Sequence, residues 1–291
     1  MTDDPLAPGL YIVATPIGNL EDITMRALRV LRSADRIACE DTRQTRKLLD
    51  RYGITTPTIS SHEHNEAARS VQLVEELKNG ARIAVVSDAG TPGISDPGMV
   101  LVSAAVAEGV PVYAIPGASA VLAALVGSGL STERFVFVGF LPPKAGARRT
   151  ALEEIADAVA IPTTVVFYEA PHRILETLAD VEAVWGADCR VVLARELTKM
   201  HEEFLRGTVH EVRAQLAVRE SIRGEIVLMI EAQPLAGDAG AGSASVKVRI
   251  AELEKSEGLT EKDALKRVAR ERGMSRSEIW RELQRERARG K

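Results

Sequence analysis

Short apolar runs alternate with amphipathic helical segments along the first 230 residues of the chain. In the first half, strands are expected over 10–14, 37–39, 83–86 and 112–115, and helices over 24–31, 71–77, 100–107 and 118–126. Short strands joined by crossover helices are typical of a parallel sheet that is buried on both faces. This half is therefore predicted to be an α/β domain with a mainly parallel sheet.

The same alternation resumes after a Gly/Ser/Thr-containing break at about 128–133. Strands are expected over 135–138, 164–168, 190–194 and 225–231, and helices over 149–159, 173–184 and 209–216. The pattern predicts a second α/β domain, although it does not fix the order of the strands. The predicted fold class is thus α/β, with two α/β domains and a smaller all-α region at the end of the chain.

Composition places the predicted domain boundaries. The segment 234–245 is rich in Gly, Ala and Ser and holds one charge, which is typical of a linker. We therefore expect an N-terminal α/β domain over 1–120, a C-terminal α/β domain over 121–233, and a helical domain over 246–291.

The helical domain resembles a helix-turn-helix. Helices are expected over 262–272 and 276–287, with a tight glycine-containing turn between them. The spacing of Ile279, Trp280 and Leu283 predicts that all three face the domain's core.

Charge is unevenly divided along the chain. The formal net charge is −4, yet residues 246–291 hold 14 basic and 9 acidic groups and residues 1–245 carry a net −9. An acidic body with a basic tail favours a nucleic-acid contact through the tail, and a merely solvated helical tail stays open as an alternative. Lys144, Arg148 and Arg149 are predicted to form an exposed basic loop, suited to RNA phosphates or simply to solvent.

Several classes of protein are excluded or disfavoured. Two cysteines, Cys39 and Cys189, cannot build a disulfide framework or a Cys-rich metal site. The uncharged segment 109–132 holds two prolines and four glycines, which favours a buried strand, turn and helix over a membrane span. His62 and His64 form a His-x-His pair without further ligands in view, so no metal site is predicted. The first residues lack the pattern of a signal peptide, and a cytoplasmic location is expected.

Gly/Pro-rich turns follow three of the expected strands, at 15–19, 87–98 and 116–120. A rigid loop at the carboxyl end of a strand is where open α/β sheets bind ligands, so we expect the three turns to converge on one pocket. The longest of them also holds Asp88 and Asp96. It matches neither the dinucleotide-binding glycine pattern nor the P-loop with its lysine, so a nucleotide phosphate is not the expected ligand. Taken singly, each segment is also compatible with an ordinary turn.

Six segments carry a resemblance to the tetrapyrrole methylase superfamily. They are Leu10–Thr24, Cys39–Arg43, Ser87–Gly98, Pro116–Ala120, Phe167–Arg173 and Ala194–Lys199. Within the superfamily they resemble the ribosomal RNA small subunit methyltransferase I branch, whose members are 16S rRNA cytidine 2′-O-methyltransferases. The resemblance covers residues 9–231, and the tail is similar to the small C-terminal domain of that branch.

The resemblance implies a homodimeric enzyme that binds S-adenosyl-L-methionine in a cleft between its two α/β domains. The implied partner is 16S rRNA in its decoding region, within a small ribosomal subunit particle. Carried over by position, the cofactor contacts are Pro16, Ala89, Gly90, Thr91, Ile94, Ser119, Ala120, Glu169, Leu197 and Thr198. Small residues suit this role because they let the backbone approach a ligand closely.

Methylation of a ribose 2′-hydroxyl requires in-line positioning and a group that accepts the hydroxyl proton. The resemblance implies that Glu40, at a strand end, is the catalytic base. Glu169, Glu196 and Lys199 are the alternatives.

Two other functions stay open at this point. The first is a tetrapyrrole C-methyltransferase acting on a precorrin or uroporphyrinogen. The turns at 14–19 and 89–92 lack the Gly-rich and Gly-Gly-Asp-Pro motifs of those enzymes, which favours the RNA branch. The second is a non-catalytic nucleic-acid-binding regulator, suggested by the basic tail alone.

Overall fold

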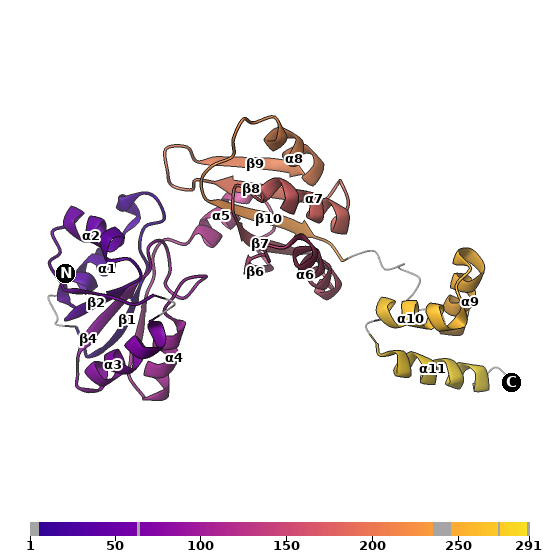
Figure 1. Cartoon of the computed structure of the whole chain (residues 1–291), viewed down its shortest axis with the longest axis horizontal. Helices are drawn as coiled ribbons and strands as arrows, with labels where there is room; N and C mark the ends of the chain where they lie inside the picture. Colours follow the sequence, from indigo (N-terminus) through magenta and orange to yellow (C-terminus); the bar gives the residue numbers. More distant parts are fainter. Residues whose placement is uncertain (1–5, 63–64, 235–245, 273, 290–291) are drawn as a thin grey trace. The chain divides into compact units, whose positions relative to one another are not determined.

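The computed structural model describes residues 6–62, 65–234, 246–272 and 274–289. Within these ranges the chain divides into two compact units. The larger unit holds two five-stranded sheets, and the smaller one holds the last three helices together with residues 157–161. Figure 1 shows both units and labels most of their helices and strands.

The first sheet is parallel throughout, with the strand order β3-β2-β4-β1-β5. Its strands are β1 (Gly9–Val13), β2 (Arg36–Cys39), β3 (Thr58–Ser60), β4 (Arg82–Val86) and β5 (Val112–Ile115). The helices between them are α1 (Met25–Ser33), α2 (Thr42–Arg51), α3 (Glu66–Lys78) and α4 (Met99–Ala107), and a 3₁₀ turn, η1 (Leu20–Asp22), precedes α1. The prediction of a mainly parallel sheet is confirmed.

Both faces of this sheet are buried, because successive residues of its strands point to opposite sides. Tyr11 and Ala84 pack with α1 and α2 in one core, whereas Leu10 and Ile83 pack with α3 and α4 in the other. This double burial explains why the strands appear as continuous apolar runs in the sequence.

Two elements of this half were not predicted. Helix α2 begins at Thr42, directly after Asp41, whose side chain accepts a hydrogen bond from the Arg43 N–H and caps the helix. Most residues of α2 are polar and only Thr45, Leu48 and Leu49 are buried, so the sequence shows little helical periodicity there. Strand β3 is three residues long and pairs only with β2, so it left no clear periodicity.

The second sheet is mixed, with the order β6-β7-β10-β8-β9. Only β6 and β7 run parallel, and the remaining pairs are antiparallel. Its strands are β6 (Phe135–Phe140), β7 (Thr163–Glu169), β8 (Arg190–Arg195), β9 (Glu203–Thr208) and β10 (Ile226–Ala232). Strand β9 was not predicted, because its sequence is largely polar and it lies at the edge of the sheet.

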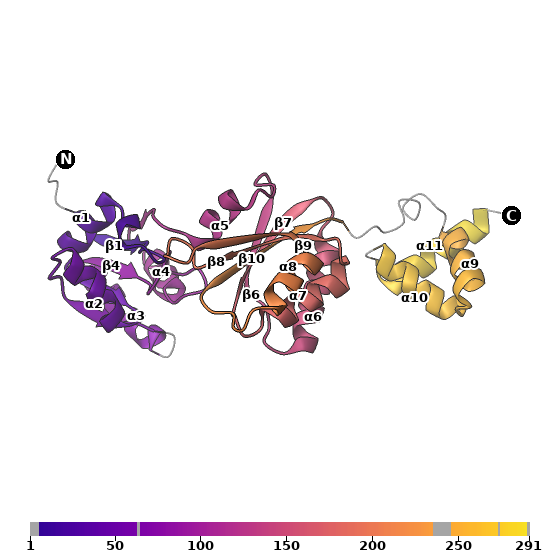
Figure 2. The same cartoon turned by 90° about the horizontal axis from the view of Figure 1, so that it is seen from above.

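Four helices accompany this sheet: α5 (Ala120–Ser128), α6 (Ala145–Ala158), α7 (Ile174–Trp185) and α8 (Val209–Ala217). Helix α5 packs against Val166, Val227 and Met229 on one face. Figure 2 shows α6, α7 and α8 together on the other side of the sheet. The uncharged segment 109–132 thus contributes β5 and α5, and no described helix has the length and apolarity needed to span a membrane.

The smaller unit is a bundle of α9 (Val246–Glu257), α10 (Glu261–Glu271) and α11 (Arg276–Arg289) around a common apolar core. Ile279 and Leu283 are buried in that core as predicted. The prediction for Trp280 is wrong, since half of its surface is exposed on α11. One helical step separates Trp280 from Ile279, and this turns the indole toward solvent.

The proposed domain limits at 120/121, 233 and 245 remain predictions, and most of the proposed linker, residues 235–245, lies outside the described residues.

The predicted basic loop is only partly a loop. Lys144 is exposed just before α6, as predicted, whereas Arg148 and Arg149 lie in that helix and Arg148 is buried. Arg148 lies in α6 with 1% of its side chain exposed, and its Nε donates to the Asp180 carboxylate on α7 at 2.7 Å. Arg149, half-exposed, donates to the same carboxylate, and the exposed Glu176 contacts Arg148 at 3.2 Å. The sequence alone could not show this arrangement, because Glu176 and Asp180 lie 28 and 32 residues after Arg148 in the chain.

The buried pair generates a stability prediction. Asp180→Ala leaves the Arg148 guanidinium buried with only the exposed Glu176 as a counter-charge, and breaking a buried pair in this way destabilises proteins by about 3–5 kcal/mol. Glu176→Ala removes the exposed partner and should change stability by about 1 kcal/mol or less. Urea denaturation of the two variants measures both effects. An Asp180→Ala variant as stable as Glu176→Ala would contradict the account.

Candidate functional site

Three loops meet at one edge of the first sheet because of the strand order. Strand β1 lies between β4 and β5, so the carboxyl ends of these three parallel strands are neighbours. The loops that follow them are the Gly/Pro turns at 15–19, 87–98 and 116–120. Their predicted convergence on one pocket is confirmed.

The first two loops are joined through their backbones. Thr15 donates its N–H to the Gly90 carbonyl at 2.8 Å, and Gly90 donates back to the Thr15 carbonyl at 3.1 Å. The buried Thr15 hydroxyl adds a hydrogen bond to the Ser87 carbonyl. The Thr91 hydroxyl reaches the Ala118 carbonyl at 3.4 Å and so connects the second loop to the third.

The first loop also contacts the second sheet. Ile17 is buried in the core between α5 and that sheet. The Asn19 N–H donates to the Thr198 hydroxyl at 3.1 Å, and a β-carbon at Gly18 would collide with Lys199 and Thr198. Glycine is therefore required at this close approach of two chain segments.

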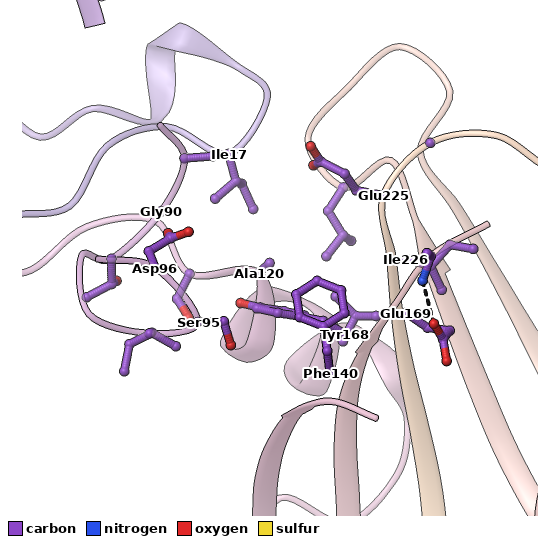
Figure 3. A pocket seen from close by; sticks show the side chains of 18 of the residues that line it. Ile17, Gly90, Ser95, Asp96, Ala120, Phe140, Tyr168, Glu169, Glu225 and Ile226 are labelled. Carbon is purple, nitrogen blue, oxygen red and sulfur yellow. Dashed lines mark hydrogen bonds between the residues drawn. The ribbon is translucent and has the colours of Figure 1, made fainter. Parts of the chain in front are cut away.

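A cavity of about 370 Å³ opens where these loops face the second sheet. This volume lies in the range of ordinary small-molecule sites, about 300–1,000 Å³. Its lining is mostly apolar or small, with Ile17, Gly90 and Ala120 on one side and Phe140, Tyr168 and Leu197 on the other. Figure 3 shows the labelled side chains around it.

The structure brings most of the predicted cofactor contacts to this cavity. Those that line it are Ala89, Gly90, Thr91, Ile94, Ser119, Ala120, Glu169 and Leu197. Pro16 and Thr198 are not among its lining residues, although each is the chain neighbour of a residue that is. Their assignment as cofactor contacts stays a prediction.

Glu169 is buried and has its carboxylate fully engaged. One oxygen accepts from the Ala170 N–H at 2.7 Å, as Figure 3 shows, and from Arg173. The other oxygen accepts from the Thr177 hydroxyl at 2.6 Å. Both carboxylate oxygens are therefore occupied by donors of the protein itself.

Glu196 and Lys199 form an ion pair at 2.9 Å, and Lys199 also contacts Glu225 at 3.0 Å. The hydrogen bond from Lys199 lowers the pKa of Glu196. Burial alone would lower the pKa of Lys199, but Glu196 and Glu225 together outweigh it and raise that pKa. Both groups are thus held in their charged forms. Neither a stabilised carboxylate nor a protonated amine is suited to accept a proton.

Glu40 lies outside the main cavity. It lines a separate, much smaller one next to Ser87 and Pro97. Burial raises the pKa of Glu40, and the nearby charges of Asp88 and Asp96 raise it further. Its assignment as the catalytic base stays a prediction.

Asp96 and the aromatic residues Phe140 and Tyr168 line the cavity but were not assigned a role from the sequence. Burial raises the pKa of Asp96, and the charge of Asp88 adds to the shift. The available signal for Asp96 was its place in the Gly/Pro loop. Tyr168 lay inside the segment Phe167–Arg173 that carried the resemblance, so position alone could have marked it.

Metal ligation has no support among the described residues, since they contain no group of three or more His, Cys, Asp or Glu side chains that could hold an ion. His62 is described, whereas its predicted companion His64 lies outside the described residues. Cys39 is buried, and desolvation raises the pKa of its thiol, as expected of a structural residue.

Comparison with known proteins defines the class. The sequence profile of the tetrapyrrole (corrin/porphyrin) methylases matches residues 9–213. The solved structure of uroporphyrin-III C-methyl transferase from Thermus thermophilus, complexed with S-adenyl homocysteine, superposes with a TM-score of 0.54 at 17% identity, over 76% of this chain and 96% of that one. The fold is that of the tetrapyrrole methylases, and the predicted fold class is confirmed.

Closer relatives narrow the assignment. A protein of Halalkalibacterium halodurans named ribosomal RNA small subunit methyltransferase I is 46% identical over 273 residues, which are 93% of each chain. A protein of the same name from Synechocystis is 44% identical over 271 residues, 93% of this chain and 95% of the relative. The chain therefore belongs to the ribosomal RNA small subunit methyltransferase I family within the tetrapyrrole methylases, and it is a methyltransferase.

Proposed function

We propose that this protein transfers the methyl group of S-adenosyl-L-methionine to the 2′-hydroxyl of a cytidine ribose in the decoding region of 16S rRNA. The observation that carries the proposal is the cavity built from three joined sheet-end loops in a chain that is 46% identical to a named ribosomal RNA methyltransferase over 93% of its length. The site of action is the cytoplasm, and the substrate is the small ribosomal subunit particle.

The residues of the cavity fit the cofactor. The flat adenine ring can pack between aliphatic side chains, and the lining offers Ile17, Ile94, Leu197 and Val227 together with small residues. A β-carbon at Gly90 would lie 3.3 Å from Ile17 Cγ2, so glycine keeps the loop backbone close to the ligand space. When bound, the cofactor supplies an electrophilic sulfonium methyl group with a good leaving group. The protein's part is to orient the hydroxyl and exclude water.

The two alternative functions have less support. The solved neighbours named as precorrin or uroporphyrin methylases are 17–19% identical, which supports a shared fold and not a shared substrate. A non-catalytic regulator would not need a cavity of this size at the junction of three sheet-end loops.

We also propose that the enzyme is a homodimer. Phe135, Val136, Val138 and Phe140 are exposed along β6, an edge strand of the second sheet. An apolar edge strand left open to water is a liability that a second copy of the chain would cover. Phe140 also lines the cavity, so such an interface would border the site.

The helical bundle supports an RNA contact. Lys262, Lys266 and Arg270 lie four residues apart on the exposed face of α10, opposite the buried Leu265 and Val268. Their spacing places three cations in a row along one helix face. Such a row can replace counterions along a phosphate backbone.

The cofactor assignment predicts the effect of a bulky side chain at Gly90. Gly90→Leu should abolish binding of S-adenosyl-L-methionine in calorimetric titration. The backbone φ of +80° at this position is disfavoured for leucine, and the leucine side chain would enter the space next to Ile17. Gly109→Leu is the matched control: its φ is +71°, yet its side chain would meet open space in the turn after α4. It should bind like wild type. Unchanged affinity in a folded Gly90→Leu variant would contradict the placement of the cofactor.

The RNA contact predicts a change in salt dependence. Replacing Lys262, Lys266 and Arg270 by Ala should weaken binding to small subunits and reduce the slope of log K against log salt by about 2–3, because up to three phosphate contacts are lost. Arg267→Ala, which removes a cation paired with Glu271, is the control and should change the slope by less than one. An unchanged slope in the triple variant would show that α10 does not contact RNA.

A further inference from the structure

We propose that Asp96 is the catalytic base that accepts the proton of the attacking ribose hydroxyl. The inference rests on the proposed function and adds a residue to which the sequence assigned no role. A base must reach the hydroxyl directly or through one water molecule, so the candidates are the carboxylates that face the cavity.

Three carboxylate side chains line the described cavity: Asp96, Glu169 and Glu225. Glu169 is engaged by Ala170, Arg173 and Thr177. Glu225 is three-quarters exposed and pairs with Lys199 at 3.0 Å. Asp96 has no ion-pair partner among the residues that the structure describes, and it is the one of the three that stays available to accept a proton.

Figure 3 shows the Asp96 carboxylate directed toward the cavity beside Gly90, across from the second-sheet residues Tyr168 and Glu225. Glu40, the base implied by the resemblance, lines only the smaller cavity behind the same loop, where it adjoins Pro97 and Gly98. The two carboxylates are close enough to interact electrostatically, but of the two it is Asp96 that lines the main cavity.

Backbone hydrogen bonds hold the loop on both sides of Asp96. Ser95 adopts a φ of +60°, a strained value for a residue with a side chain. Gly93 donates its N–H to the Pro97 carbonyl at 3.2 Å and closes the loop around Asp96. The buried Glu66 of α3 accepts from the Gly98 N–H at 2.7 Å and the Val100 N–H at 3.2 Å, which anchors the end of the loop. Strain that surrounding structure maintains at one residue is typical of functional sites.

The electrostatic setting suits a base. Asp96 is surrounded by Asp88 in its own loop, Glu40 after β2, Tyr168 on β7 and Glu225 before β10. Burial and the Asp88 charge raise the pKa of Asp96, while a hydrogen bond from Ser87 opposes the shift. A carboxylate with a raised pKa is a stronger proton acceptor than an ordinary one.

The step balances. The hydroxyl oxygen attacks the sulfonium methyl carbon, so the C–O bond forms as the C–S bond breaks and its electron pair remains on sulfur. Asp96 accepts the hydroxyl proton and later releases it to water. No oxidant, reductant or metal ion is needed.

The test is single-turnover methyl transfer to small ribosomal subunits isolated from cells that lack this enzyme. Asp96→Asn keeps the size of the side chain and removes its basicity, so the rate should fall by about 10²–10⁴-fold while calorimetric affinity for S-adenosyl-L-methionine stays within twofold. Asp96→Glu should recover part of the rate. Glu40→Gln should stay within threefold of wild type.

The pH profile separates a base from a structural residue. The wild-type rate should fall as the pH drops through the raised pKa of Asp96, because the protonated carboxyl cannot accept a proton. Asp88→Asn removes a neighbouring charge that raises this pKa, so the fall should move to lower pH. Asp96→Asn should lose this acid limb altogether. A merely structural role would leave the limb in place in all variants.

Three results would overturn the inference: an Asp96→Asn rate less than tenfold below wild type, a loss of cofactor affinity that accounts for the whole loss of rate, or an acid limb that persists without Asp96. A hundredfold loss in Glu40→Gln alone would assign the base to Glu40. If wild-type enzyme transfers no methyl group to the particle, the proposed function itself is wrong. An active wild type with an active Asp96→Asn variant contradicts this inference alone.

Discussion

The site depends on the reciprocal backbone hydrogen bonds between Thr15 and Gly90. They join two loops that leave neighbouring parallel strands, and they require that Gly90 adopt a φ of +80°. With the buried Thr15 hydroxyl bonded to Ser87, the two loops form one rigid wall. Strand order makes this possible, since β1 lies between β4 and β5 and places all three sheet-end loops side by side.

The second sheet forms the opposite side of the cavity and so completes the site. Ile17 from the first loop enters the core beneath α5, and the Asn19 backbone bonds to Thr198. The chain around Thr198 is itself unusual, since Glu196 and Thr198 both have positive φ values. Among the described residues of the larger unit, the non-glycine residues with positive φ are Ser95, Glu196 and Thr198, and they lie on segments that border or line the cavity. This distribution fits a site whose shape is held by the packing around it.

Much of the fold could be predicted from the sequence, because strands buried on both faces leave continuous apolar runs and the Gly/Pro turns mark where those strands end. The order of strands in the second sheet could not be predicted, because β7 pairs with β10, which lies some 60 residues further along the chain. Polar elements such as α2 and β9 carry too little periodicity to be seen. The burial of Arg148 depends on Asp180, which the sequence gives no reason to place beside it.

The sequence predicted which loops form the candidate site, but it could not predict where the side chains of those loops point. Sequence places Glu40, Asp88 and Asp96 at strand ends, where any of them could face a ligand. Only the folded loop distinguishes Asp96, which lines the cavity, from Glu40, which lines the smaller space behind it. Likewise, Glu169 lines the cavity as expected, yet its carboxylate is committed to Arg173 and Thr177.

In the proposed function, this cavity delivers a methyl group to a ribose oxygen of small-subunit RNA. The most direct measurement is to incubate the enzyme with methyl-labelled S-adenosyl-L-methionine and small subunits from cells lacking it, digest the RNA to nucleosides, and identify the labelled product. The account predicts 2′-O-methylcytidine from one position in the decoding region. Label on a nucleobase or on ribosomal protein, or no label on the particle, would contradict it.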